Sequence, residues 1–251
     1  MPDSSASWHP LTESQLRFWR GHQLAPTVPL YNMAWRFDLY QALDPTLFAE
    51  AFNSVVAKSD ILRSVFETRD NEPMQRVASA SFELPEPLDL STHTDPEFAL
   101  GEHLDIWIKQ PFDLTRTTLC SQLVKLTDNH WVWFVCQHHI SCDAQSGSVL
   151  FDAVSDVYRE LKSGSQKQEA HLAQYFEFAQ NHPADEERKD VTRTRPISLP
   201  YGTKPSNNAQ SERITVPLPD ELRAQFERFC DAPEYRLFTP DLSQLAAYVT
   251  A

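Results

Sequence analysis

Glycine is scarce in this sequence. The 251 residues include five glycines, about 2%, where an average protein has roughly 7%. No two of them stand close enough to form the G-x-G-x-x-G turn of a dinucleotide-binding fold or a P-loop. The chain therefore carries no sequence motif for either kind of nucleotide site.

Cysteine pairs, basic residues and long apolar runs are also lacking. The four cysteines form no C-x-x-C pair, so we expect free, mostly buried thiols. Lys and Arg number 22 against 35 Asp and Glu, a net charge of −13, which argues against nucleic acid and anionic membranes as partners. No apolar run approaches the roughly 20 residues of a membrane span. No signal peptide is visible, so we expect a cytoplasmic protein.

What is present is a core-forming pattern, with 41% hydrophobic residues. Apolar periodicity and helix-start residues predict an alternation of strands and helices, typical of an α/β or α+β fold with a mixed sheet and packed helices. The expected helices begin at a capping box at 12–15, at Asp44-Pro45, at Asp95-Pro96 and at Ser146. The expected strands cover 31–39, 61–67, 119–126 and 130–140, the last of them central and buried.

The second half of the chain changes character. We predict a first lobe over 1–165, a polar, proline-containing linker over 166–212 with a short helix near 172–179, and the start of a second lobe over 213–251. A strand at 214–218 and helices over 220–230 and from Thr239-Pro240 are expected there. Because the last helix reaches Ala251 without a cap, the sequence looks truncated.

The strongest local signal lies at the junction of the buried strand and the helix that follows. His138 and His139 are adjacent, so strand alternation predicts that one ring is catalytic or ligand-like while the other packs behind the sheet. Asp143 is expected either to orient a ring or to pair with a cation and fix the turn. A purely structural histidine pair with a helix-capping aspartate is the alternative. The spacing does not complete a zinc site with Cys136 and Cys142, and no G-x-S-x-G turn marks a serine nucleophile.

Three motifs together resemble those of nonribosomal peptide synthetase condensation domains, members of the chloramphenicol acetyltransferase-like superfamily. Residues 138–144 are similar to H-H-x-x-x-D-G, residues 11–19 to S-x-A-Q-x-R-L-W, and residues 58–66 to R-H-E-x-L-R-T-x-F. Tyr31-Asn32 and the segment 111–114 recur at similar places. Ala144 departs from the motif glycine, and 58–60 reads Lys-Ser-Asp in place of Arg-His-Glu.

The resemblance implies roles for these residues. His139 is expected to project into a tunnel between two lobes as general base or as a positioning group for the acceptor amine, and His138 to be structural. Arg63 and Asp143 are expected to form a partly buried ion pair that aims His139, whose loss would cost roughly 3–5 kcal/mol. Ala144 and Ser146 are expected to line the acceptor channel.

The implied reaction is amide formation between a donor acyl or peptidyl thioester and an acceptor aminoacyl thioester. Both substrates ride on the phosphopantetheine of carrier proteins, with no cofactor or metal bound directly, and adenylation domains or other synthetase modules are further expected partners. A starter-type domain or a domain fed in trans is favoured, since the first motif begins near the N-terminus. An acyl-CoA-dependent acyltransferase and a non-catalytic platform domain are the alternatives, and the 251-residue chain alone is expected to be weakly active or inactive.

Overall fold

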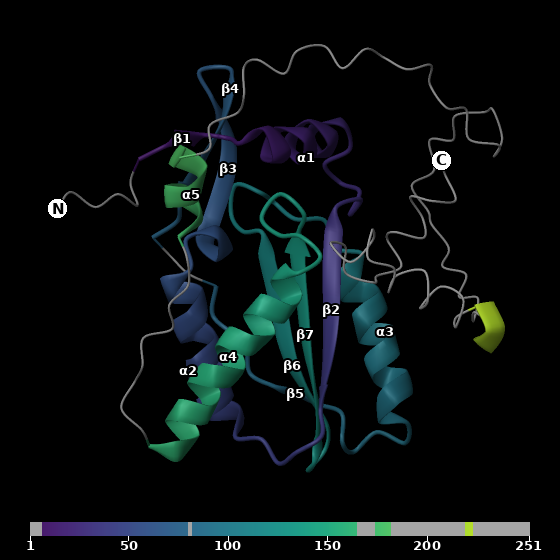
Figure 1. Cartoon of the computed structure of the whole chain (residues 1–251). Helices are drawn as coiled ribbons and strands as arrows, with labels where there is room; N and C mark the ends of the chain where they lie inside the picture. The colour runs from purple at the N-terminus through teal and green to yellow at the C-terminus, as the bar shows by residue number, and fades with distance from the viewer. Residues whose placement is uncertain (1–6, 80–81, 165–173, 182–218, 223–251) are drawn as a thin grey trace. The chain divides into compact units, whose positions relative to one another are not determined.

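The computed structural model describes residues 7–79, 82–164, 174–181 and 219–222 (Figure 1). The chain divides into two compact units, Met1–Thr203 and Lys204–Ala251. In the second unit, Asp220 to Leu222 are helical. The predicted strand at 214–218, the remainder of the helix at 220–230 and the helix from 240 lie outside the described residues, so these predictions stay untested.

The first unit is built on a four-stranded sheet with the order β2-β7-β6-β5. The middle strand β7 pairs antiparallel with both β2 and β6, whereas the short β5 runs parallel to β6. Every residue of β7 after His130 is buried, which confirms the predicted central strand. The strands are β2 (Asn32–Leu39), β5 (Leu88–Asp89), β6 (Leu119–Thr127) and β7 (His130–His138).

Helices cover both faces of this sheet. The helices α2 (Pro45–Lys58) and α4 (Ser146–Ser163) pack together on one face around a core that includes Trp133. The helix α3 (Pro96–Ile108) packs on the other face against apolar residues of β5, β6 and β7 (Figure 1). The predicted starts of α2 and α3 are confirmed, because the carboxylates of Asp44 and Asp95 each accept from an N–H of the first turn.

A second sheet of three strands, in the order β1-β4-β3, lies beyond the end of α2. Its strands are β1 (His9–Pro10), β3 (Ser64–Arg69) and β4 (Glu72–Val77). The predicted strand at 61–67 is therefore partly wrong: Ile61–Arg63 forms a 3₁₀ turn, η2, whose first N–H donates to the Asp60 carboxylate. Asp70 and Asn71 adopt positive φ values of 49° and 66°, as the two-residue turn of the β3–β4 hairpin requires.

Two further helices complete the described structure. The helix α1 (Glu13–Leu24) begins at the predicted capping box on Thr12 and lies across the end of the first sheet at which β7 terminates (Figure 1). The short helix α5 (Tyr175–Asn181) confirms the helix expected near 172–179, displaced by a few residues. The first two N–H groups of α5 donate to the Asp60 carboxylate, at 2.9 and 2.7 Å. Within the described residues, no helix combines the length and apolar character that crossing a membrane requires.

Candidate active site

The imidazole of His139 lies just past the end of β7, held from two sides. Its backbone N–H donates to the carbonyl oxygen of Tyr31 at 2.8 Å, which ties the loop to the start of β2. Its ring stacks on Phe18 of α1, with the ring centroids 4.3 Å apart and the planes 16° from parallel. The side chain is half-buried. The sheet and α1 together therefore fix both the position and the plane of this ring.

A backbone carbonyl determines which nitrogen of His139 carries the proton. Nδ1 lies 2.8 Å from the carbonyl oxygen of Cys142. Because a carbonyl oxygen can only accept, Nδ1 must donate, and the neutral ring then carries its lone pair on Nε2. The arrangement presents Nε2 as a hydrogen-bond and proton acceptor.

The neighbouring His138 has the opposite tautomer and a different environment. Its side chain is 2% exposed and packs edge-on against His22, Tyr31 and Phe112. Its Nδ1 accepts from the N–H of Ile140 at 3.1 Å, so the proton sits on Nε2. Burial lowers the pKa of His138 to about 3, which keeps the ring neutral near pH 7. These contacts suit a structural residue.

Strand alternation predicts that the rings of His138 and His139 lie on opposite sides of β7, but in the structure both rings contact the same helix, α1. His138 packs against His22 and His139 stacks on Phe18. The reason is that β7 ends at His138, so the alternation of the strand does not extend to His139.

Asp143 fixes the turn between His139 and α4 by capping the helix. Its Oδ1 accepts from the N–H of Gln145 at 3.0 Å and from the N–H and hydroxyl of Ser146 at 2.9 and 2.8 Å. The Ser146 Oγ in turn accepts from the backbone N–H of Asp143 at 2.9 Å. The hydrogen bond from the Ser146 side chain is the main cause that lowers the pKa of the Asp143 carboxyl.

The predicted ion pair between Arg63 and Asp143 is wrong for this structure. The Arg63 guanidinium donates to the carbonyl oxygens of Ser59 and Ala78, both at 3.3 Å. No ion pair joins Arg63 and Asp143 within the described part of the chain. Each side chain instead hydrogen-bonds to backbone groups near it. The exposed Asp143 carboxylate accepts from N–H groups at the start of α4, and the Arg63 guanidinium donates to carbonyl oxygens on either side of η2.

Ala144 and Ser146 differ in their surroundings. Ala144 is exposed on the turn before α4, and it is not among the described non-glycine residues with positive φ, so the backbone there does not require the motif glycine. Ser146 is half-buried and lines a cavity of about 300 Å³ between the ends of α2 and α4.

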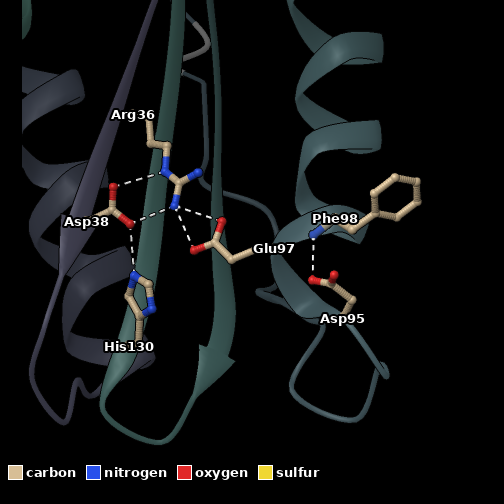
Figure 2. Close-up of polar contacts among 6 residues, drawn as sticks. All are labelled: Arg36, Asp38, Asp95, Glu97, Phe98 and His130. Carbon is tan, nitrogen blue, oxygen red and sulfur yellow. Dashed lines mark hydrogen bonds and ion pairs between the residues drawn. The ribbon is translucent and has the colours of Figure 1, made fainter.

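One cluster of described side chains has the spacing of metal ligands, and it lies elsewhere. Asp38, Glu97 and His130 place one ligand atom each within 4.8 Å of one another. Figure 2 shows that Arg36 already enters this group: its Nη2 lies 2.8 Å from Asp38 Oδ1 and 3.0 Å from both Glu97 oxygens. The His130 Nε2 lies 2.8 Å from the same Asp38 oxygen. The guanidinium thus supplies the positive charge that the two carboxylates need.

The cysteines near the histidines are not suited to act as nucleophiles. Cys120, Cys136 and Cys142 are free thiols, and Cys230 lies outside the described residues. Burial raises the pKa of both Cys136 and Cys142 to about 12, so their thiolate forms are rare near neutral pH.

Comparison with known proteins identifies the family. The model of the family described as "Condensation domain" matches residues 6–238. Surfactin synthase subunit 1 of Bacillus subtilis is 25% identical over 97% of the chain, and enterobactin synthase component F of Escherichia coli O157:H7 is 29% identical over 62% of it. The chain spans 7% and 12% of these two relatives.

Comparison with solved structures also finds condensation domains. A mutant of the starter condensation domain of rhizomide synthetase RzmA, in complex with C8-CoA and Leu-SNAC, matches 70% of this chain with a TM-score of 0.67 and 26% identity. The match covers 41% of that domain's chain. The first condensation domain of the CDA synthetase matches with a TM-score of 0.65 at 24% identity, which supports the fold. The fold is the chloramphenicol acetyltransferase-like α+β fold of condensation domains.

Proposed function

This chain belongs to the condensation-domain family, and on that premise we propose that it takes part in amide formation between two thioester-bound substrates of a nonribosomal peptide synthetase. Residues 1–165 form the N-terminal lobe of such a domain in this proposal, residues 166–212 the linker and residues 213–251 the start of the second lobe. The partners are acyl or peptidyl carrier proteins, whose phosphopantetheine arms bring the substrates, together with adenylation domains.

The proposed reaction exchanges one acyl bond for another. The acceptor amine nitrogen forms a bond to the donor carbonyl carbon, and the bond between that carbon and the donor sulfur breaks. The proton that the nitrogen loses passes to His139 Nε2 and from there to the departing thiolate. An α-amine with a pKa of about 7.7–8.0 is partly unprotonated near pH 7, so positioning of the amine contributes more than its deprotonation.

One observation carries this proposal: the Nδ1–H of His139 is engaged by the Cys142 carbonyl, which leaves Nε2 as the acceptor. In this role His139 is the catalytic residue. His138 supports it as a neutral packing residue, Asp143 by capping α4, and Arg63 by holding the backbone near η2. Ala144 and Ser146 are proposed to line the acceptor channel.

The donor is proposed to be an acyl thioester and the acceptor an aminoacyl group, as in a starter domain. The support comes from the neighbouring structure of a starter condensation domain in complex with C8-CoA and Leu-SNAC. Acyl-CoA and acyl-carrier donors are therefore both to be supplied. Use of the acyl-CoA alone, with no carrier on either side, would instead favour a free-standing acyltransferase.

The test is amide formation detected by mass spectrometry with an aminoacyl-loaded acceptor carrier. We expect His139→Ala to lower the rate by about 10²-fold or more, the range in which positioned acid–base groups act. His130→Ala is the matched control, since His130 stands at the far end of the same strand, and the rate should stay within about twofold. Measurable amide formation that is equally fast in His139→Ala and in the unmodified protein would refute the catalytic assignment. No amide formation by the unmodified protein would favour a platform domain.

A further inference from the structure

The side chain of Gln137, one residue before the histidine pair, is buried with its polar atoms unused. It is 1% exposed, and neither its Oε1 nor its Nε2 has a hydrogen-bond partner among the described residues. By contrast, the buried Gln75 donates to Gln15 at 2.8 Å and to the carbonyl oxygen of Pro10 at 3.1 Å. Buried amides in folded proteins are almost always paired, so an unpaired one calls for a partner.

Gln137 lines the cavity of about 300 Å³ at the ends of α2 and α4. At the roughly 30 Å³ that one water molecule occupies in the liquid, the cavity has room for about ten non-hydrogen atoms. Its walls combine apolar side chains with serine hydroxyls and the loop that follows His139. The lining residues are Val55, Ser59, Ile61, Leu62, Gln137, Ser141, Asp143, Gln145, Ser146, Val149 and Leu150.

The chemistry of this cavity selects for a neutral group. The Gln137 amide offers one acceptor and two donors, so a group that both donates and accepts satisfies it better than a ketone, which only accepts. A carboxylate would face the Asp143 carboxyl at the same cavity. The apolar walls favour a hydrocarbon chain that carries this polar group.

We propose that the cavity binds a substrate substituent of about five to ten non-hydrogen atoms bearing a hydroxyl or carboxamide group, and that Gln137 is the residue that recognises this group. The inference deepens the proposed function, on which it rests, by naming a substrate class. The substituent can belong to the donor acyl chain or to the side chain of the acceptor amino acid, and the test separates the two sources.

The test measures binding of unreactive probes and does not depend on turnover. Pantetheine amides, with nitrogen in place of the thioester sulfur, are prepared in two matched pairs: hexanoyl and 5-hydroxyhexanoyl for the donor, norleucyl and glutaminyl for the acceptor. Each is titrated into protein labelled with ¹⁵N. The side-chain NH₂ signals of Gln137 are assigned in the unmodified protein, in a sample labelled with ¹³C and ¹⁵N, from their through-bond correlations to the Cβ and Cγ of the same residue.

We expect the polar member of one pair to shift the Gln137 signals and to bind at least tenfold more tightly than its apolar partner. In Gln137→Leu this preference should fall to twofold or less, whereas Gln23→Leu, a change on the exposed surface of α1, should leave it unchanged. The pair that shows the preference identifies the source.

Unshifted Gln137 signals with all four probes, or a preference that persists in Gln137→Leu, would overturn the proposal and leave water as the partner of the amide. Because the shifts are read on the unmodified protein, a variant that fails to fold does not blunt the test. Binding preference without amide formation would retain the cavity assignment and count against the proposed function alone.

Discussion

Replacing Asp143 tests what holds the loop beneath His139. In the structure its carboxylate is exposed and accepts three hydrogen bonds at the start of α4, at 2.8 to 3.0 Å. Loss of such a cap typically costs about 1 kcal/mol of stability, within a range of roughly 0.5–2 kcal/mol. A buried ion pair with Arg63 would predict roughly 3–5 kcal/mol on removal of one partner. We therefore expect Asp143→Ala to lower the free energy of unfolding by about 1 kcal/mol.

Urea unfolding of a mutant series separates the two explanations. Asp143→Asn keeps the Oδ1 acceptor and should recover most of the loss, since capping needs an oxygen and not a charge. In a double-mutant cycle with Arg63→Met, the coupling energy should lie within about 0.5 kcal/mol of zero, as for independent sites. Because the folded pKa of Asp143 is lowered, its stabilising effect is present above the unfolded pKa and is lost as the pH falls through the folded pKa. The asparagine variant should lack that loss.

Two results would refute this reasoning. One is an Asp143→Asn variant as unstable as Asp143→Ala, which would show that the charge itself is required. The other is a coupling energy above about 1 kcal/mol between Arg63 and Asp143, which would show that the two side chains interact in solution.

Three further predictions concern packing, helix docking and pH. A Cβ at Gly147 would overlap the indole of Trp35, so Gly147→Ala should lower the free energy of unfolding by about 1–3 kcal/mol in urea, whereas Gly101→Ala, with open space around it, should raise it by about 0.5–1 kcal/mol. Asp60→Ala should speed hydrogen exchange at the first two amides of α5 and leave exchange in β7 unchanged. Exchange at those two amides as slow as in the unmodified protein would contradict the hydrogen bonds from α5 to Asp60. The pKa of an unfolded histidine is about 6.5, whereas burial lowers that of folded His138 to about 3. The unfolded state therefore binds more protons, so the free energy of unfolding should fall as the pH drops from about 6.5 towards 5. In urea titrations at several pH values, His138→Gln should show a smaller fall.

The elements that the sequence predicts correctly are those with local causes. A capping box on Thr12 and the Asp-Pro starts at 44 and 95 encode their helix beginnings within four residues, and the unbroken apolar run encodes a strand buried on both faces. The strands β1, β4 and β5 escape prediction because they are short and pairing with a partner strand defines them. In β4 the proline at 73 and the charged neighbours also hide the alternation. The turn at Asp70 and Asn71 is the signal that marks this hairpin.

The candidate site divides in the same way. The histidine pair at the end of a buried strand marked the place of the site, and the resemblance to the H-H-x-x-x-D-G motif singled out His139. The ion pair of Arg63 with Asp143 rested on the family resemblance and on opposite charge, and neither reports distance in this chain: each group has backbone partners closer in the chain. The sequence does not predict a role for Gln137, because the cavity that its side chain lines forms only where α2 and α4 come together in the fold.

The contacts of His139 bear on whether the proposed reaction relies on proton transfer or on positioning. The ring is stacked on Phe18, its backbone is tied to Tyr31, and its Nδ1 is bound to the Cys142 carbonyl, so three separate segments restrict its rotation. A general base also needs its lone pair held within hydrogen-bond reach of the proton that it takes, so this restraint serves proton transfer and positioning alike. Orientation can contribute about 7–11 kcal/mol to a barrier, and a positioned acid–base group about 10²–10⁴ in rate. These magnitudes favour Nε2 as a fixed acceptor that aligns the amine, with proton transfer as the smaller part of its effect.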